Sequence, residues 1–202
     1  MPIVGSAWSS TLKGTLSGMG MNGSQLQSFT DAVGLGSTMS IVGKAFTTTD
    51  VGLIPGVGVG VGAGITGLSP MDAANLIYGN CSAFGFVGAR LHDFCTACGS
   101  ALVSTLADAI LSSTHAPVWQ GAGSVVTGSI AVVPSEWGSN IHSAAAGFMG
   151  SKWPDFANAI GAGSANHVIA KGTGSVVISG SFTGPTPPGP LPGAGVGAGT
   201  IS

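Results

Sequence analysis

Apolar residues recur with helical spacing at three places in the chain. Leu26, Phe29 and Val33 stand at positions i, i+3 and i+7, which lie on one face of a helix. The same spacing returns in two later triplets: Leu91, Phe94 and Cys98, then Trp153, Phe156 and Ile160. Each triplet lies in a segment that begins and ends with glycine: residues 23–34, 88–99 and 150–161. The pattern predicts three copies of one amphipathic helix, offset by 65 and then 62 residues.

A second helix is predicted before each of these copies. Trp8, Leu12 and Leu16 are spaced i, i+4 and i+8, which predicts a helix over about residues 9–18. Trp137 stands in a segment similar to the one around Trp8, ahead of the third copy. We therefore expect each repeat to be a helical hairpin.

The second helix of the first repeat has two further signals. Ser24 is a plausible N-cap, because its hydroxyl can accept a hydrogen bond from a free backbone N–H. We expect this helix to continue through residues 41–42, so Gly34 lies inside it as a kink or as a point of close packing.

Glycine alternates with other residues after the first helical hairpin. Residues 56–65 follow a period of two, which is the period of a β-strand and puts Val57, Val59 and Val61 on one face. The other face is bare glycine, which admits a closely packed neighbour. A flexible linker would have the same composition. Because a similar run returns at residues 192–197, we favour an ordered extended segment.

These patterns together predict a mainly α fold with extended Gly-rich segments (α+β), built from three helical-hairpin repeats of about 62–65 residues. Phe29, Phe94 and Phe156 are expected at equivalent buried positions. Residues 183–192 contain five prolines and predict a stiff, polyproline-like arm. The expected divisions are residues 1–68, 69–132 and 133–182 for the repeats and 183–202 for the C-terminal arm.

Charge is scarce in this chain. Only 6% of the 202 residues are charged, the net charge is −2, and 36 residues are glycine. Charge-driven disorder is excluded by this composition, and five cations are too few for a nucleic-acid surface. Collagen is excluded because glycine does not fall at every third position. Surfaces normally carry more charge, so we expect much of this surface to be buried against other subunits, with a homo-oligomer as one form.

Membrane and export signals are weak. Residues 51–71 are uncharged and long enough to span a bilayer, but their repeated glycines disfavour a stable helix. Residues 1–4 have neither a basic nor an apolar leader region, so we expect no signal peptide and no membrane contact. Three cysteines are an odd number, which fits reduced thiols in a cytosol.

The cysteines raise the question of a metal site. His92, Cys95 and Cys98 follow an H-x-x-C-x-x-C spacing, with Cys81 upstream, and zinc takes such ligands. Cys98, however, aligns with Val33 and Ile160 in the other repeats, which indicates a core position. We therefore expect no metal, although the sequence leaves this alternative open.

Sequence motifs for other binding sites or for catalysis are also weak. A G-x-G-x-x-G match inside the Gly-rich run is not followed by a helix, and no G-x-S-x-G elbow occurs. Asp93 and Asp155 stand at matched positions near helix starts, where acidic residues favour the helix dipole. Trp119 has no aromatic counterpart in the other repeats and is a candidate contact residue. We expect no enzyme activity, no catalytic residues, no cofactor and no small-molecule substrate.

Three segments carry a resemblance to a known family. Residues 4–12 (V-G-S-A-W-S-S-T-L), residues 32–37 (A-V-G-L-G-S) and residues 192–199 (P-G-A-G-V-G-A-G) resemble uncharacterised virion structural proteins of tailed bacteriophages. The resemblance implies a component of the neck, tail, baseplate or capsid surface. It also implies assembly in the host cytoplasm, a place in the virion and other virion structural proteins as partners.

Two functions remain open at this point. The first is a virion assembly protein that binds neighbouring subunits through its Gly-rich segments. The second is a Gly-rich repeat protein of a cell surface or an extracellular filament. For the first function, the expected subunit-contact residues are Val57, Val59, Val61, Ile65, Trp119, Val196 and Ile201.

Overall fold

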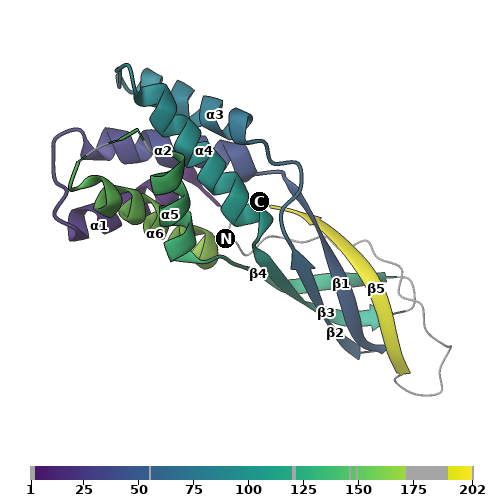
Figure 1. The fold of residues 1–202 in the computed structure, drawn as a ribbon. Coiled ribbons are helices and arrows are strands. Elements are labelled where there is room, and N and C mark those ends of the chain that lie inside the picture. The colour runs from purple at the N-terminus through teal and green to yellow at the C-terminus, as the bar shows by residue number, and fades with distance from the viewer. Residues whose placement is uncertain are drawn as a thin grey trace.

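Helix pairs and strand pairs alternate along the chain. The computed structural model describes residues 3–54, 56–119, 122–145, 147–148, 150–171 and 191–201. The helices in this part of the chain are α1 (Gly5–Gly18), α2 (Leu26–Ile41), α3 (Pro70–Ala83), α4 (Leu91–Ala107), α5 (Pro134–Ala144) and α6 (Trp153–Lys171). The strands are β1 (Ala45–Ile54), β2 (Gly56–Ala63), β3 (Ile110–Trp119), β4 (Ala122–Ala131) and β5 (Leu191–Thr200). The fold is therefore mainly helical with an antiparallel sheet (Figure 1).

The sheet extends away from the helices. Its order is β4-β3-β2-β1-β5, and each neighbouring pair is antiparallel. The last strand therefore pairs with the first: Thr200 lies opposite Ala45 near the helices, and Leu191 lies opposite Ile54 at the far end. The sheet is curled, because β1 also approaches β3 across the intervening β2. Residues 191–200 of the expected C-terminal arm, 183–202, thus form a strand of the chain's own sheet.

Local sequence explains where α3 begins. The hydroxyl of Ser69 accepts a hydrogen bond from the backbone N–H of Asp72 at 3.2 Å, and Pro70 is the first helical residue. Ser at the N-cap and Pro at the first position both suit a helix start, because neither leaves a backbone donor unsatisfied there.

The expected N-cap of α2 is wrong. This helix begins at Leu26, and its cap residue, Gln25, makes no side-chain capping bond. The backbone N–H of Leu26 instead donates to the carbonyl of Gly23 at 3.1 Å, which closes a turn before the helix. Ser24 lies inside that turn, so its hydroxyl is one residue too early to cap the helix.

The six helices in the described part of the chain close into a ring. The two helices of each pair contact each other, and the second helix of each pair contacts the first helix of the next pair. The series is closed because α6 packs on α1. At this closure Trp8 is fully buried, stacks on His167 with ring centroids 5.1 Å apart, and donates from Nε1 to the Ser164 hydroxyl at 3.2 Å.

A glycine brings the two helices of each pair into backbone contact. Gly34, Gly99 and Gly161 of the second helices lie against Ser9, Ala74 and Gly138 of the first helices, respectively. A Cβ atom added to Gly99 would lie 2.5 Å from the backbone nitrogen of Ala74 and 2.7 Å from the carbonyl oxygen of Pro70. Close packing, rather than a kink, is therefore the role of Gly34 and its counterparts.

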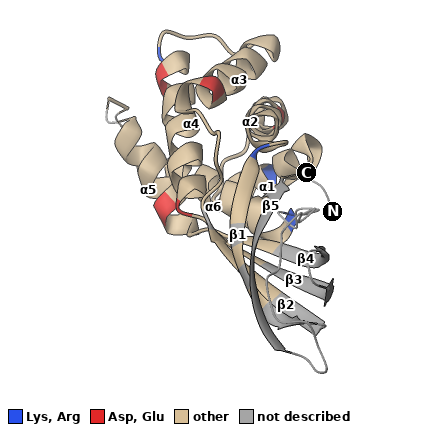
Figure 2. Cartoon of the chain, turned by 90° about the vertical axis from the view of Figure 1, so that its right-hand side faces the viewer, with Lys and Arg blue, Asp and Glu red and all other residues tan. Residues whose placement is uncertain are grey.

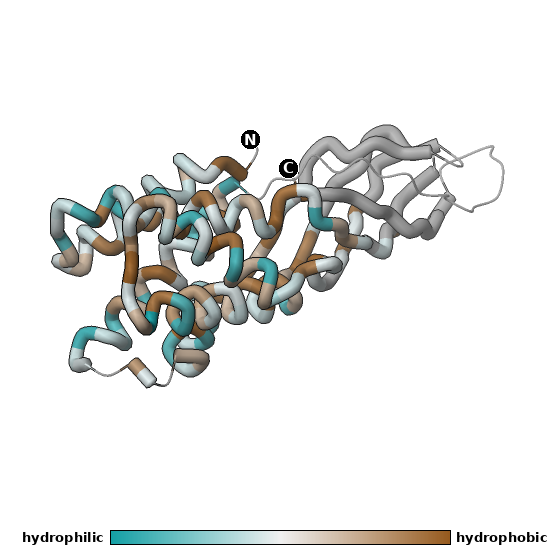
Figure 3. The backbone as a smooth tube through the Cα atoms, turned by 90° about the horizontal axis from the view of Figure 1, so that it is seen from above, coloured by the Kyte–Doolittle hydropathy of each residue, from teal (hydrophilic) through white to brown (hydrophobic). Residues whose placement is uncertain are grey.

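In the described part of the chain, no helix is both long enough and apolar enough to cross a membrane. Hydrophobic and hydrophilic positions are interspersed along the helical part of the chain (Figure 3). The few charged side chains lie on the helices and near their junction with the sheet (Figure 2). Arg90 pairs with Asp93, and Lys152 pairs with Asp155.

The glycine contacts lead to a stability prediction. Replacing Gly99 with alanine should destabilise the fold by about 1–3 kcal/mol, because the added methyl group overlaps backbone atoms of α3 that cannot move aside. The matched control is Gly79→Ala in α3, where an added Cβ meets nothing within 4 Å. This control should stabilise the protein by up to about 1 kcal/mol. Urea unfolding measures both changes, and equal effects of the two substitutions would contradict the packing role.

Candidate functional site

Three phenylalanine rings meet at the end of the helical body that is farthest from the sheet. Phe29, Phe94 and Phe156 are each the fourth residue of α2, α4 and α6. Their ring centroids are 5.7 Å (29–94), 5.7 Å (29–156) and 6.1 Å (94–156) apart, which is within the range of favourable aromatic pairs. Because α2 and α4 lead into β1 and β3 at their other ends, this cluster and the sheet occupy opposite ends of the molecule.

Further aromatic side chains extend the cluster into a pocket. Trp153 lies 6.0 Å from Phe156, and Phe148 stacks on Trp153 with centroids 4.8 Å apart. The cavity has a volume of about 530 Å³. We call it the aromatic pocket; its main lining is Phe29, Phe86, Phe94, Phe148, Trp153 and Phe156. Val87 stands on its rim and is 89% exposed.

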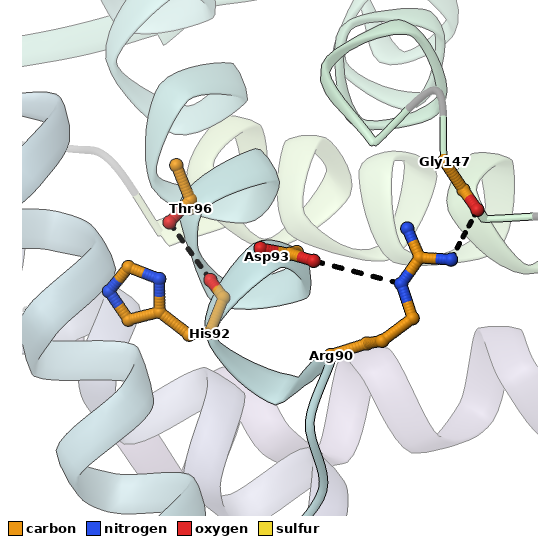
Figure 4. A network of polar contacts seen from close by, with 5 residues as sticks. All are labelled: Arg90, His92, Asp93, Thr96 and Gly147. Atoms are coloured by element: carbon orange, nitrogen blue, oxygen red, sulfur yellow. Dashed lines mark hydrogen bonds and ion pairs between the residues drawn. The ribbon is translucent and has the colours of Figure 1, made fainter.

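Arg90 borders this pocket at the start of α4. Its guanidinium lies 4.5 Å from the centre of the Phe148 ring, donates to the carbonyl of Gly147, and pairs with Asp93 at 3.6 Å (Figure 4). Both partners of the ion pair are about half exposed, so this pair contributes at most about 1 kcal/mol. The contacts join the loop before α4 to the segment between α5 and α6.

A smaller hollow of about 410 Å³ shares Arg90 with the aromatic pocket. Its polar lining includes His92, Asp93 and Thr96, and the Thr96 hydroxyl donates to the His92 carbonyl at 2.9 Å. The His92 ring points away from Asp93 in Figure 4 and meets Tyr78 edge-on at 5.6 Å. The cation and the anion here are paired with each other. This end of the molecule therefore offers mainly aromatic surface, which suits an apolar, uncharged group.

The second candidate surface is one face of the sheet. The register pairs Val51 with Val59, and Thr49 with Val61, while Gly60 between the two valines is buried. Side chains alternate between faces along a strand, so the valines share the outer face. We call this surface the valine face; its large apolar members are Val51, Val59, Val61 and Ile110, which are 54%, 49%, 59% and 59% exposed, respectively.

The structure places the expected contact residues in three groups. Val59 and Val61 are exposed on the valine face. The backbones of Val57, Trp119 and Val196 lie in β2, β3 and β5, and their side chains fall outside the described part of the structure. Residues 183–190 of the expected polyproline-like arm also fall outside it.

The expectation for Ile65 and Ile201 is corrected. Their side chains are 4% and 2% exposed and belong to the core of this chain, so they present no surface to a neighbour. Both follow strand ends where the sheet meets the helices: the N–H of Ile65 donates to the Leu106 carbonyl, and that of Ile201 donates to the Lys44 carbonyl.

The three cysteines are buried between α3 and α4. Cys81, Cys95 and Cys98 are free thiols that are 0%, 0% and 4% exposed, in agreement with the predicted core positions. A hydrogen bond to Cys81 and then burial raise the pKa of Cys95, and burial raises the pKa of Cys98. At Cys95 and Cys98, burial and a raised pKa disfavour the thiolate that metal binding and nucleophilic attack require, whereas the hydrogen bond with Cys95 lowers the pKa of Cys81. The residues that the structure describes contain no group of three or more His, Cys, Asp or Glu side chains placed to hold a metal ion.

His167 is the other buried titratable group. It is 1% exposed, and its Nε2 atom has no hydrogen-bond partner among the described residues. Burial, with a smaller contribution from the charge of Lys171, lowers the pKa of His167 to about 4. The contact between α1 and α6 therefore favours the neutral form of the His167 imidazole.

Comparison of the chain with protein-family models, with curated proteins and with solved structures finds no match. The geometry of the two surfaces therefore carries the functional argument.

Sequence reasoning placed no binding site at the aromatic pocket. It assigned Phe29, Phe94 and Phe156 to the core by their repeat spacing, but only Phe94 is buried, and the other two are partly exposed to the pocket. A useful signal was present in the aromatic residues Phe86 and Phe148, which precede the second and third copies of the amphipathic helix.

The low pKa of His167 predicts that the fold becomes less stable at acidic pH. An unfolded histidine has a pKa of about 6.5, so the stability from the neutral buried ring is complete above that pH. It should fall by about 1.4 kcal/mol per pH unit as the pH drops from about 6.5 to about 4. His167→Phe keeps a ring against Trp8 without the titration, so its unfolding free energy should depend less on pH in this window. Urea unfolding at pH 7.5 and 5.0 measures the difference.

The control for this experiment is His92→Gln, which changes an exposed histidine of α4. This variant should lose as much stability between the two pH values as the parent protein does. A parent-like pH dependence in His167→Phe would contradict the assignment of the effect to the buried ring.

Proposed function

We propose that this chain is a structural assembly protein of a tailed-phage virion and that it binds neighbouring subunits through the valine face. The single observation that supports the subunit contact most directly is the set of half-exposed Val51, Val59 and Val61 side chains on a sheet that extends away from the helical body. Exposed apolar patches of this kind are typical of protein interaction sites.

The low charge supports the same proposal. With 6% charged residues, the chain has little of the surface charge that keeps free proteins apart in solution. Among the side chains that the structure describes, the outer face of β2 and β3 adds neutral groups to the valines, including Ser112, which hydrogen-bonds to Ser129 at 2.7 Å. A second apolar or neutral surface could cover this face without desolvating a charged side chain.

Part of this proposal is that the fold is a threefold internal repeat. Support comes from the matched positions of the three phenylalanines in α2, α4 and α6, and from the matched glycine contacts within the three helix pairs. In this scheme each repeat supplies a helical hairpin to the ring and extended chain to the sheet. Repeats of this kind stabilise one another by burying the face that a single repeat leaves exposed.

The size of the contact fits a repeating assembly. Complete burial of a valine side chain contributes about 1.5 kcal/mol or more, so covering the exposed half of each valine contributes on the order of 1 kcal/mol. Such contacts are weak singly and become strong when many copies repeat them in one particle. The purified protein is therefore expected to self-associate with increasing concentration.

The test is a charge introduced on the valine face. The double substitution Val59→Lys/Val61→Lys should shift the protein toward monomer in sedimentation velocity experiments, because each lysine must be desolvated in the contact. Incorporation of the same variant into virus particles should fall at least tenfold when it is expressed with the other virion proteins.

The matched control is Val42→Lys, which places lysine at a similarly exposed valine (43%) next to the end of α2. Circular dichroism and urea unfolding show whether each variant keeps the parent fold. If the folded Val59→Lys/Val61→Lys protein associates and assembles as the parent does, the valine face is not the contact surface.

A further inference from the structure

The aromatic pocket lies at the opposite end of the molecule from the valine face and is not used by the proposed subunit contact. Its lining is almost entirely apolar, and its one cation, Arg90, is already paired with Asp93 and with the Gly147 carbonyl. Phe148 and Trp153 stack in its wall, and Val87 on its rim is exposed to solvent. An occupant should therefore be apolar, uncharged and able to lie against aromatic rings.

The chain carries a segment with this chemistry. Residues 183–192 read T-G-P-T-P-P-G-P-L-P and contain no charge. Pro185 and Pro188 are three residues apart, as are Pro187 and Pro190, and a polyproline II helix repeats every three residues. Each pair would therefore lie on one face of such a helix. Aromatic-lined grooves recognise proline segments with this spacing, because little conformational entropy is lost when the stiff chain binds.

The segment cannot reach the pocket of its own chain. It ends at β5, whose first residue, Leu191, pairs with Ile54 at the far end of the sheet. The ten residues of β1 place that end about 30 Å from the helical body, at about 3.3 Å per residue. Pro185 is six residues from Leu191, so an extended chain at about 3.1 Å per residue carries it only about 19 Å back. The pocket lies farther still, at the opposite end of α2.

We propose that the aromatic pocket binds the proline-rich segment 183–190 of a second copy of this chain. The contact joins the sheet end of one copy to the pocket end of the next. Such a head-to-tail contact uses two different surfaces, so it builds a ring or a filament rather than a closed pair. This inference deepens the proposed assembly function by naming a partner and a second surface.

The first experiment uses a synthetic peptide of residues 183–190, the proline-rich segment that precedes β5. The receptor is the full-length variant Pro187→Ala/Pro188→Ala/Pro190→Ala, in which the competing segment of the chain itself is altered. Tryptophan fluorescence and calorimetry should show saturable binding of the peptide. A peptide with all its prolines replaced by alanine should bind at least tenfold more weakly.

The pocket is tested with a substitution on its exposed rim. Introducing Val87→Asp into the same receptor should weaken peptide binding at least tenfold, because a carboxylate would have to be desolvated against the segment. Val42→Asp, at an exposed valine outside the pocket, should leave binding unchanged. No saturation at millimolar peptide, equal binding of the alanine peptide, or equal binding to the Val87→Asp receptor would each overturn the proposal.

The second experiment separates this contact from the valine face. The receptor with Val59→Lys/Val61→Lys added should bind the peptide as the original receptor does, because the two surfaces lie at opposite ends of the molecule. If the peptide fails to bind while Val59→Lys/Val61→Lys abolishes self-association of the parent chain, only the pocket proposal falls. If the peptide binds and Val59→Lys/Val61→Lys associates normally, only the valine face falls.

Discussion

Backbone contact at glycine is the constraint on which the rest of this structure depends. The helices of each pair approach so closely at Gly34, Gly99 and Gly161 that a methyl group at any of these positions would overlap the partner helix. Close approach leaves little space between the first and second helices of each pair. The ring of helices can therefore be filled mainly by small and medium-sized side chains, and the large buried Trp8 and Trp137 pack edge to face with ring centroids 6.2 Å apart.

The contact between α6 and α1, which closes the ring of helices, combines aromatic stacking with a buried hydrogen bond. At the contact between α6 and α1, a buried tryptophan and a buried neutral histidine stack, and a serine hydroxyl accepts the indole N–H. The corresponding surface between α4 and α5 places Asn140 beside Thr105 instead. Polar groups at these joints direct which helix faces meet, whereas apolar packing alone would allow neighbouring helices to slide.

The two ends of the molecule differ in what they expose. The sheet end exposes valine side chains, which alternate with glycine along β2. The helical end exposes aromatic rings around a cavity. Both surfaces are nearly free of charge, in keeping with a chain in which 6% of residues are charged. Molecules with two dissimilar apolar ends are suited to assemble in series, which is the physical basis of both proposals above.

Much of the local structure could be predicted from the sequence alone, including the apolar stripes of α2, α4 and α6 and the core position of Cys98. Helical and strand periods are set within a few residues, so a single chain is enough to read them. Only the tertiary structure decided that Phe29, Phe94 and Phe156 surround one pocket and that Ile65 and Ile201 belong to the core. The sequence spacing of two helices says nothing about the angle at which they pack, and that angle decides whether a matched side chain faces the core, a pocket or the solvent.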